Sequence, residues 1–91
     1  MMMNANDGDV SDMLLTIVRS LVDKPEQVEI VPVPDAASTT FRIWVDPTDV
    51  GKVIGMNGRT ARALRTIVGA NASKMRRSFS VDILERAPQS T

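Results

Sequence analysis

The chain has 91 residues, of which 43% are hydrophobic and 24% are charged, and its eleven basic residues balance eleven acidic ones. A chain of this length forms one small domain with a thin but sufficient hydrophobic core. It contains no cysteine and no histidine, which excludes disulfides and thiolate metal sites and removes the commonest general base and metal ligand. We therefore expect a protein that is not an enzyme and that holds no metal ion or cofactor.

The neutral total hides an uneven distribution of charge along the chain. Residues 1–47 carry three basic and eight acidic residues, a net charge of −5, whereas residues 48–91 carry eight basic and three acidic residues, a net charge of +5. A split of this size indicates a face that attracts an anion. The alternative is that helices simply carry arginine on their solvated sides.

The two ends of the chain carry no recognisable targeting or membrane segment. The start, MMMNANDGDV, lacks the basic segment and apolar run of a secretory signal. No apolar stretch approaches the ~20 residues that cross a bilayer. We expect a cytoplasmic protein that does not engage a membrane, with loose tails at residues 1–8 and 87–91 around a domain at residues 9–86.

The first predicted elements are a helix and an edge strand. From Asp9 to Asp23 the apolar residues recur at three- and four-residue spacing, which predicts an amphipathic helix that stops before Pro25. The segment QVEIVPV at 27–33 is predicted to form a strand, and its prolines confine it to a sheet edge.

A second strand follows a predicted turn at 34–40. The sequence FRIWV at 41–45 alternates in polarity, which predicts one core-facing side. The residues on that side are Phe41, Ile43 and Val45. Trp44 is then on the opposite face, where it is exposed or covered by a partner.

The remaining elements are two helices and a strand. Asp46-Pro47-Thr48 opens a short helix that ends near Ile54, with Asp46 or Thr48 as its cap. A longer helix is predicted from Arg59 to Ser73, and its inner stripe is Ala61, Leu64, Val68 and Ala72. The last strand, SFSVDIL, directs Phe79, Val81 and Ile83 inward. This order predicts an α+β fold, a three-stranded sheet with its helices on one face.

Three glycines lie close together: Gly51 within the short helix, and Gly55 and Gly58 between it and the longer helix. Their spacing fits neither a P-loop, which needs G-x-x-x-x-G-K-[ST], nor the dinucleotide fingerprint G-x-G-x-x-G after a strand. The remaining motif is G-x-x-G at 55–58. This motif is common by chance, but its position between two helices, with a strand pattern on each flank, makes it specific.

Here the chain resembles a KH domain. The stretch DPTDVGKVIGMNGRTARALRTIV is similar to the loop region of small bacterial single-KH RNA-binding proteins of the KhpA type, and LLTIVRSLVDKPEQVEI is similar to their first helix and strand. The resemblance covers roughly residues 10–86 and implies the type II KH fold, αββααβ. It also implies a small cytoplasmic RNA chaperone or RNA-binding regulator. Such proteins form homodimers, or pair with a larger RNA-binding protein that contains a KH domain.

The resemblance implies that the G-x-x-G loop binds single-stranded RNA, and the residues supply a mechanism. Two glycines without Cβ atoms let a sugar-phosphate backbone come close, and the N terminus of the following helix attracts a phosphate. Nearby basic side chains would screen phosphates, while Val53 and Ile54 would form an apolar floor for unstacked bases. The expected RNA-binding residues are Lys52, Val53, Ile54, Gly55, Met56, Asn57, Gly58, Arg59 and Arg62.

Met56 departs from the family pattern, in which the first variable loop position is usually basic or strongly polar. We therefore expect weaker and less salt-dependent binding, whereas Asn57 keeps a donor and tolerates left-handed backbone. For the basic residues the alternative is a solvated helix face, and Arg65 is equally compatible with both. Three more basic residues at the far end of the helix are explained by its negative dipole end. They are Lys74, Arg76 and Arg77.

Two further alternatives concern assembly. Ile67 is about 100° from the inner stripe of its helix, so it either widens the core face or contacts a second copy. The main rival function is a KH-shaped module for dimerisation or protein docking, in which the glycine loop no longer binds nucleic acid.

Overall fold

The computed structural model describes the backbone of residues 6–75 and 77–87 and the side chains of residues 8–70 and 77–87. The elements in chain order are α1 (Asn6–Leu21), β1 (Glu29–Pro34), β2 (Ser38–Val45), α2 (Val50–Ile54), α3 (Arg59–Met75) and β3 (Ser78–Glu85). Short 3₁₀ turns occupy Pro25–Gln27, Pro47–Asp49 and Met56–Gly58. The predicted α+β order of helices and strands is confirmed.

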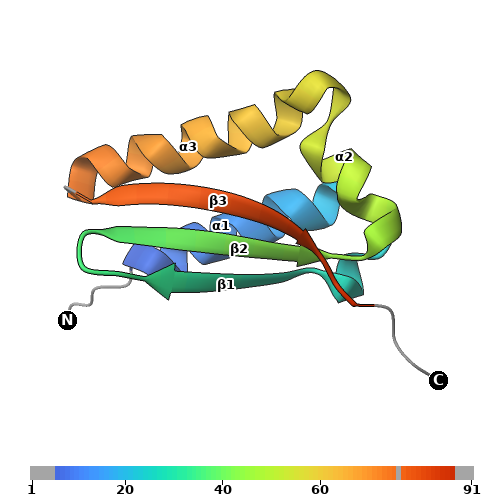
Figure 1. Cartoon of the computed structure of the whole chain (residues 1–91), viewed down its shortest axis with the longest axis horizontal. Coiled ribbons are helices and arrows are strands. Elements are labelled where there is room, and N and C mark those ends of the chain that lie inside the picture. Colours follow the sequence, from blue (N-terminus) through green and yellow to red (C-terminus); the bar gives the residue numbers. More distant parts are fainter. Residues whose placement is uncertain (1–5, 76, 88–91) are drawn as a thin grey trace.

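β2 is the central strand of the three-stranded sheet. It pairs antiparallel with β1 and parallel with β3, so that Phe41 is opposite Pro32 on one side and Val81 on the other. The parallel pairing requires a crossover, which α2 and α3 provide. Figure 1 shows α3 running along β3, while the end of α1, α2 and the start of α3 gather at the end of the sheet toward which β2 and β3 point.

The core lies between one face of this sheet and the helices. The predicted inward residues of β2 have no exposed surface, and from α3 the predicted Ala61, Leu64 and Val68 are buried. Residues of α1 complete the same cluster, namely Val10, Leu14 and Val18. The predicted stripe residue Ala72 lies outside the described side chains. Helices therefore cover one face, as predicted, and Trp44 lies partly buried on the other.

The largest differences from the predicted boundaries are at the starts of α1 and β2. α1 begins at Asn6 instead of Asp9, and acidic residues are favourable in the first turn of a helix. β2 begins at Ser38 instead of Phe41, because the Asp35 N–H donates to the Ser38 carbonyl at 2.7 Å and confines the turn to residues 35–37. The strand gains two threonines, a residue type that favours strands.

Arg77 stabilises the turn at residues 35–37. The sequence predicted instead that Arg77 interacts with the negative end of the α3 dipole. Arg77 follows α3, and its Nη2 atom donates to the carbonyl oxygens of Asp35 and Ser38 at 3.2 and 2.8 Å and to Thr39 Oγ1 at 2.9 Å. The side chain thereby joins the start of β3 to the β1–β2 connection. The side chains of Lys74 and Arg76 lie outside the described part of the chain.

Across the described ranges 6–75 and 77–87, no helix combines the length and the apolar character that crossing a membrane requires.

Candidate nucleic-acid interface

The glycine loop forms a sharp bend between α2 and α3, at one end of the molecule (Figure 1). Gly55 has φ 80° and ψ 169°, a combination open to glycine alone. A Cβ atom placed there would lie 2.7 Å from Thr60 Cβ and 2.8 Å from Thr60 N. Gly55 is therefore required because the first turn of α3 packs directly against it.

Gly58 serves a different purpose in the same bend. Its φ is 73°, and a Cβ atom built on it would meet no atom within 4 Å. Asn57, with φ 57° and ψ 26°, is the one left-handed non-glycine residue among those described, as its side chain predicted. The side chain of Thr60 thus occupies the space beside Gly55, whereas at Gly58 the bend exposes bare main chain.

The start of α3 faces this bend and is suited to an anion. The 3₁₀ turn Met56–Gly58 that leads into the helix has no side-chain cap, and the first turn of α3 contains no acidic residue. The N–H groups of Gly58 and Arg59 donate to the carbonyl oxygens of Gly55 and Met56, and the dipole of α3 places positive charge at this end.

Exposed arginines extend from the loop along α3. Arg62 Nη2 lies 3.5 Å from the carbonyl oxygen of Asn57, a long contact that keeps the guanidinium beside the loop. Within the described side chains, none of Arg59, Arg62 and Arg65 forms an ion pair. The basic residues that do form ion pairs are Lys24, Lys52 and Arg86. The arginines of α3 therefore present uncompensated positive charge.

Lys52 is placed differently from these arginines. Its Nζ atom lies 3.3 Å from Asp23 Oδ2 and 3.5 Å from Asp49 Oδ1. The hydrogen bond and the negative charge of Asp23 raise the pKa of Lys52, burial opposes them, and the hydrogen bond and charge of Asp49 add smaller contributions that also raise it. Its positive charge is already balanced by protein carboxylates.

The apolar surface beside the loop differs from the predicted one. Val53 has no exposed surface and belongs to the hydrophobic core, so the expectation that its side chain is a floor for bases is wrong. Ile54 is 38% exposed and Met56 is 79% exposed. These two side chains flank Gly55, and they are the apolar groups that a base could contact.

Asp49 is a residue of this site that the sequence analysis did not single out. Its carboxylate is fully buried and accepts hydrogen bonds from the N–H groups of Asp23 at 3.1 Å and Lys24 at 3.0 Å. Burial opposes ionisation, but the two N–H donors and Lys52 outweigh it, so the pKa of Asp49 lies below its usual value. No local pattern in the sequence marks a contact across 26 residues.

Asp46, in contrast, performs the predicted capping role. Its Oδ2 atom accepts hydrogen bonds from the hydroxyl and the N–H of Thr48, the latter at 3.0 Å, and lies 3.6 Å from Lys24 Nζ. These interactions, the Thr48 hydroxyl first, hold the pKa of Asp46 below its usual value. Of the two candidate caps, Asp46 is the one that acts.

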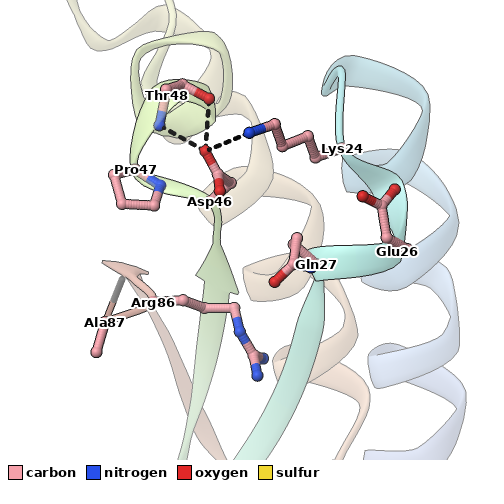
Figure 2. A pocket seen from close by; sticks show the side chains of 8 residues that line it. All are labelled: Lys24, Glu26, Gln27, Asp46, Pro47, Thr48, Arg86 and Ala87. Atoms are coloured by element: carbon pink, nitrogen blue, oxygen red, sulfur yellow. Dashed lines mark hydrogen bonds and ion pairs between the residues drawn. The ribbon is translucent and has the colours of Figure 1, made fainter. Parts of the chain in front are cut away.

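A hollow of about 510 Å³ opens near Asp46, at the end of the sheet (Figure 2). It is lined by Lys24, Glu26, Gln27, Asp46, Pro47, Thr48, Arg86 and Ala87. Both of its cations are paired with acids, since Arg86 Nη1 lies 3.0 Å from Glu29 Oε1 and Lys24 contacts Asp46. This hollow therefore offers an anion much less than the loop does. No cluster of three acidic side chains that could hold a metal ion occurs among the described residues.

Ile67 lies on a separate side of α3. It is 39% exposed, and Ala63 and Ala70, four residues before it and three after, are also exposed. At 100° per residue these three positions share one flank of the helix, while Arg62 and Arg65 lie on the other. The exposed flank does not support the interpretation that Ile67 widens the core.

Comparison with known proteins agrees with this architecture. A family model described as KhpA/KhpB, KH domain, matches residues 11–83. A protein of Borreliella burgdorferi named RNA-binding protein KhpA is 41% identical over 86% of this chain and 95% of its own length. Proteins of the same name from Listeria monocytogenes and Halalkalibacterium halodurans are 41% and 44% identical. These matches cover 84% and 76% of this chain, and 100% and 91% of the relatives.

No solved structure matches the chain significantly. The family model spans every helix and strand apart from the first turn of α1 and the end of β3. The relatives are matched over nearly their whole length. The chain therefore belongs to the KhpA/KhpB KH-domain family.

Proposed function

We propose that this protein binds single-stranded RNA at the G-x-x-G loop and the start of α3, without catalysing a reaction. The observation that carries the proposal is the row of uncompensated arginines, Arg59, Arg62 and Arg65, beside bare main chain at Gly58. The naming of the relatives as RNA-binding proteins supports the same function. Single-stranded nucleic acid combines the phosphates and the unstacked bases that these groups suit.

The binding mode follows from the chemistry of the loop. A phosphate would approach Gly58, where a side chain does not obstruct it, and would interact with the positive end of α3. Arg59 and Arg62 would contact neighbouring phosphates without reading sequence. Ile54 and Met56 would offer apolar contacts to unstacked bases. Because Met56 supplies no charge, the salt dependence of binding would come from the arginines and the helix end.

The biological role that we propose is that of a cytoplasmic RNA chaperone or RNA-binding regulator, with the binding domain at residues 9–86. Its partners would be single-stranded RNA and either a second copy of the chain or a larger RNA-binding protein with a KH domain. The exposed flank of α3 around Ile67 is the surface we assign to that pairing.

The double variant Met56→Asp, Asn57→Asp tests the site. Met56 is 79% exposed and aspartate tolerates the left-handed conformation of Asn57, so the fold should persist. Two carboxylates at the loop should repel phosphates and abolish the gel shift of a labelled single-stranded RNA. A control variant, Thr16→Glu with Ala87→Asp, adds the same charge at exposed positions elsewhere. Unchanged affinity of the loop variant would contradict the assignment.

A docking module is the second candidate, and the exposed Ile67 favours it. The two functions respond differently to the same variants. If the protein binds RNA, the loop variant should lose RNA affinity and keep its oligomeric state. If the protein is a docking module, the wild type should not bind RNA, and substitution of Ile67 should disrupt its assembly.

A further inference from the structure

The short helix that carries the glycine loop is fixed at its start by a buried carboxylate. Asp49 has no exposed surface, and its two oxygens accept the N–H groups of Asp23 and Lys24. Those N–H groups lie just after α1 ends at Leu21. One side chain thus joins the base of α2 to the connection between α1 and β1.

The length of α2 makes this attachment important. The helix has five residues, too few to be stable by hydrogen bonding alone. Its position depends on tertiary contacts with α3, β3 and α1, among which Asp49 holds its start and Val53 lies in the core. A movement of α2 would carry Gly55 with it, since the Gly55 N–H donates to the Gly51 carbonyl at 2.9 Å.

A buried carboxylate also requires a counter-charge, because an isolated ion is costly to remove from water. Lys52 is the one described cation paired with Asp49, at 3.5 Å. Its second partner, Asp23, has a side chain that is 77% exposed, and such solvated pairs contribute little. The ammonium group is therefore held by both carboxylates, and its contact with Asp49 is the one that neutralises a buried charge.

We propose that Lys52 is the counter-ion of Asp49, and that this pair positions α2 and the glycine loop and makes no contact with RNA phosphates. Lys52 and Asp49 are then positioning residues, and phosphate contact is left to the arginines of α3. The RNA measurements below rest on the proposed function, whereas the hydrogen-exchange measurements do not.

The salt dependence of RNA binding separates the two roles of a basic residue. Each phosphate contact on a single strand contributes about 0.7 to the slope of log affinity against log salt. We would measure binding of a fluorescein-labelled oligouridine between about 50 and 200 mM salt. The variants are Lys52→Gln, Arg62→Gln and, as a matched control, Lys24→Gln, which removes the same charge from a lysine whose side chain pairs with Asp46.

Arg62→Gln should lower the slope by about 0.7. Lys52→Gln should lower the RNA affinity and leave the salt slope unchanged. Lys52→Arg should restore the affinity, and Lys24→Gln should change neither the affinity nor the slope. Asp23→Asn should leave the slope unchanged, because Asp49 still holds Lys52. A slope that falls in Lys52→Gln as far as in Arg62→Gln, or that steepens in Asp23→Asn, would overturn the proposal.

Amide hydrogen exchange of the free protein tests the positioning role directly. In Lys52→Gln, the amides of Asp23 and Lys24 should exchange about tenfold faster, which corresponds to about 1.4 kcal/mol of local stability. Lys52→Arg should retain protection, and so should Arg62→Gln. Unchanged protection in Lys52→Gln would overturn the proposal, even if that variant binds RNA poorly. If the wild-type protein fails to bind oligouridine, the proposed function is wrong, and exchange still decides whether Lys52 holds Asp49.

Discussion

At the scale of single residues, the two glycines of the loop have separable roles. Gly55 is needed by the protein itself, since any Cβ atom there would contact the backbone of Thr60. Gly58 faces open space, so its missing side chain leaves room for a ligand. Spacing alone predicted both as points of close approach, and only the backbone angles and neighbours distinguish a folding requirement from a binding one.

Alanine substitutions should separate these roles. Gly55→Ala combines a glycine-only conformation with a steric conflict, and should cost about 3 kcal/mol or more of unfolding free energy. Gly58→Ala adds only the left-handed strain of about 1 kcal/mol, yet places a methyl group where we propose the RNA backbone approaches. Urea unfolding followed by Trp44 fluorescence measures the first effect, and RNA titration measures the second.

The glycine prediction would be contradicted by similar losses of stability in the two variants. It would also fail if Gly58→Ala, folded as the wild type is, bound RNA with undiminished affinity. The second result would count against the proposed binding mode and leave the structural role of Gly55 intact.

The side chains of α2 show why a sequence pattern does not predict the buried side of a very short helix. A helix of five residues contains little more than one turn, so periodicity cannot fix which side faces inward. The prediction therefore placed Val53 at the RNA surface, although it is buried, and treated Lys52 as a free cation. Lys52 contacts Asp23, which is distant in sequence, and Asp49, whose burial no local pattern indicates, and only the fold brings the three residues together.

At the scale of elements, the long periodic segments were predictable. The core stripe of α3 and the alternation of β2 follow from simple spacing, and the structure confirms both. Junctions were less predictable, because their contacts are made across the chain. Arg77 illustrates this, since it donates to carbonyl groups near residue 35 from a position that local reasoning assigned to the end of a helix.

The junction between α1 and α2 should be sensitive to acid. The pKa of Asp49 is lowered in the folded protein, against about 3.9 in an unfolded chain. A depressed folded-state pKa stabilises the protein above the unfolded value, and this contribution disappears as pH falls through the folded value. We expect it to be fully present above about pH 5 and to diminish below about pH 4.

Urea unfolding at a series of pH values measures this effect. The difference in unfolding free energy between the wild type and Asp49→Asn should be constant near neutral pH and should shrink in acid. Asp46→Asn is a useful comparison, because Asp46 also has a lowered pKa but is only capping a surface turn. A difference for Asp49→Asn that does not change with pH would show that its charge does not stabilise the junction.

At the scale of the whole molecule, the zero net charge hides a difference between the basic residues that form ion pairs and the arginines of α3. Among the described residues, the basic residues in ion pairs are Lys24, Lys52 and Arg86. The positive charges of these three residues are therefore balanced by carboxylates. Within the described side chains, Arg59, Arg62 and Arg65 form no ion pair. The sequence predicted the positive charge of the second half of the chain. It did not predict which basic residues pair with carboxylates, because those pairs form only in the fold.

The two flanks of α3 suggest that RNA binding and assembly use different surfaces. Ile67 lies on the flank opposite Arg62 and Arg65, and an isoleucine that is 39% exposed beside two exposed alanines is suited to burial against another chain.

Ile67→Glu should therefore reduce the mass measured by light scattering to that of one chain. At concentrations where the wild type is also a monomer, the unfolding midpoint of Ile67→Glu should change little, because the side chain is 39% exposed. Thr16→Glu on α1 should leave the mass unchanged. If Ile67→Glu keeps the wild-type mass, or if the wild type is already a monomer at high concentration, the flank is not a contact between copies. Loss of oligomerisation with retained RNA affinity would show that the two surfaces act independently.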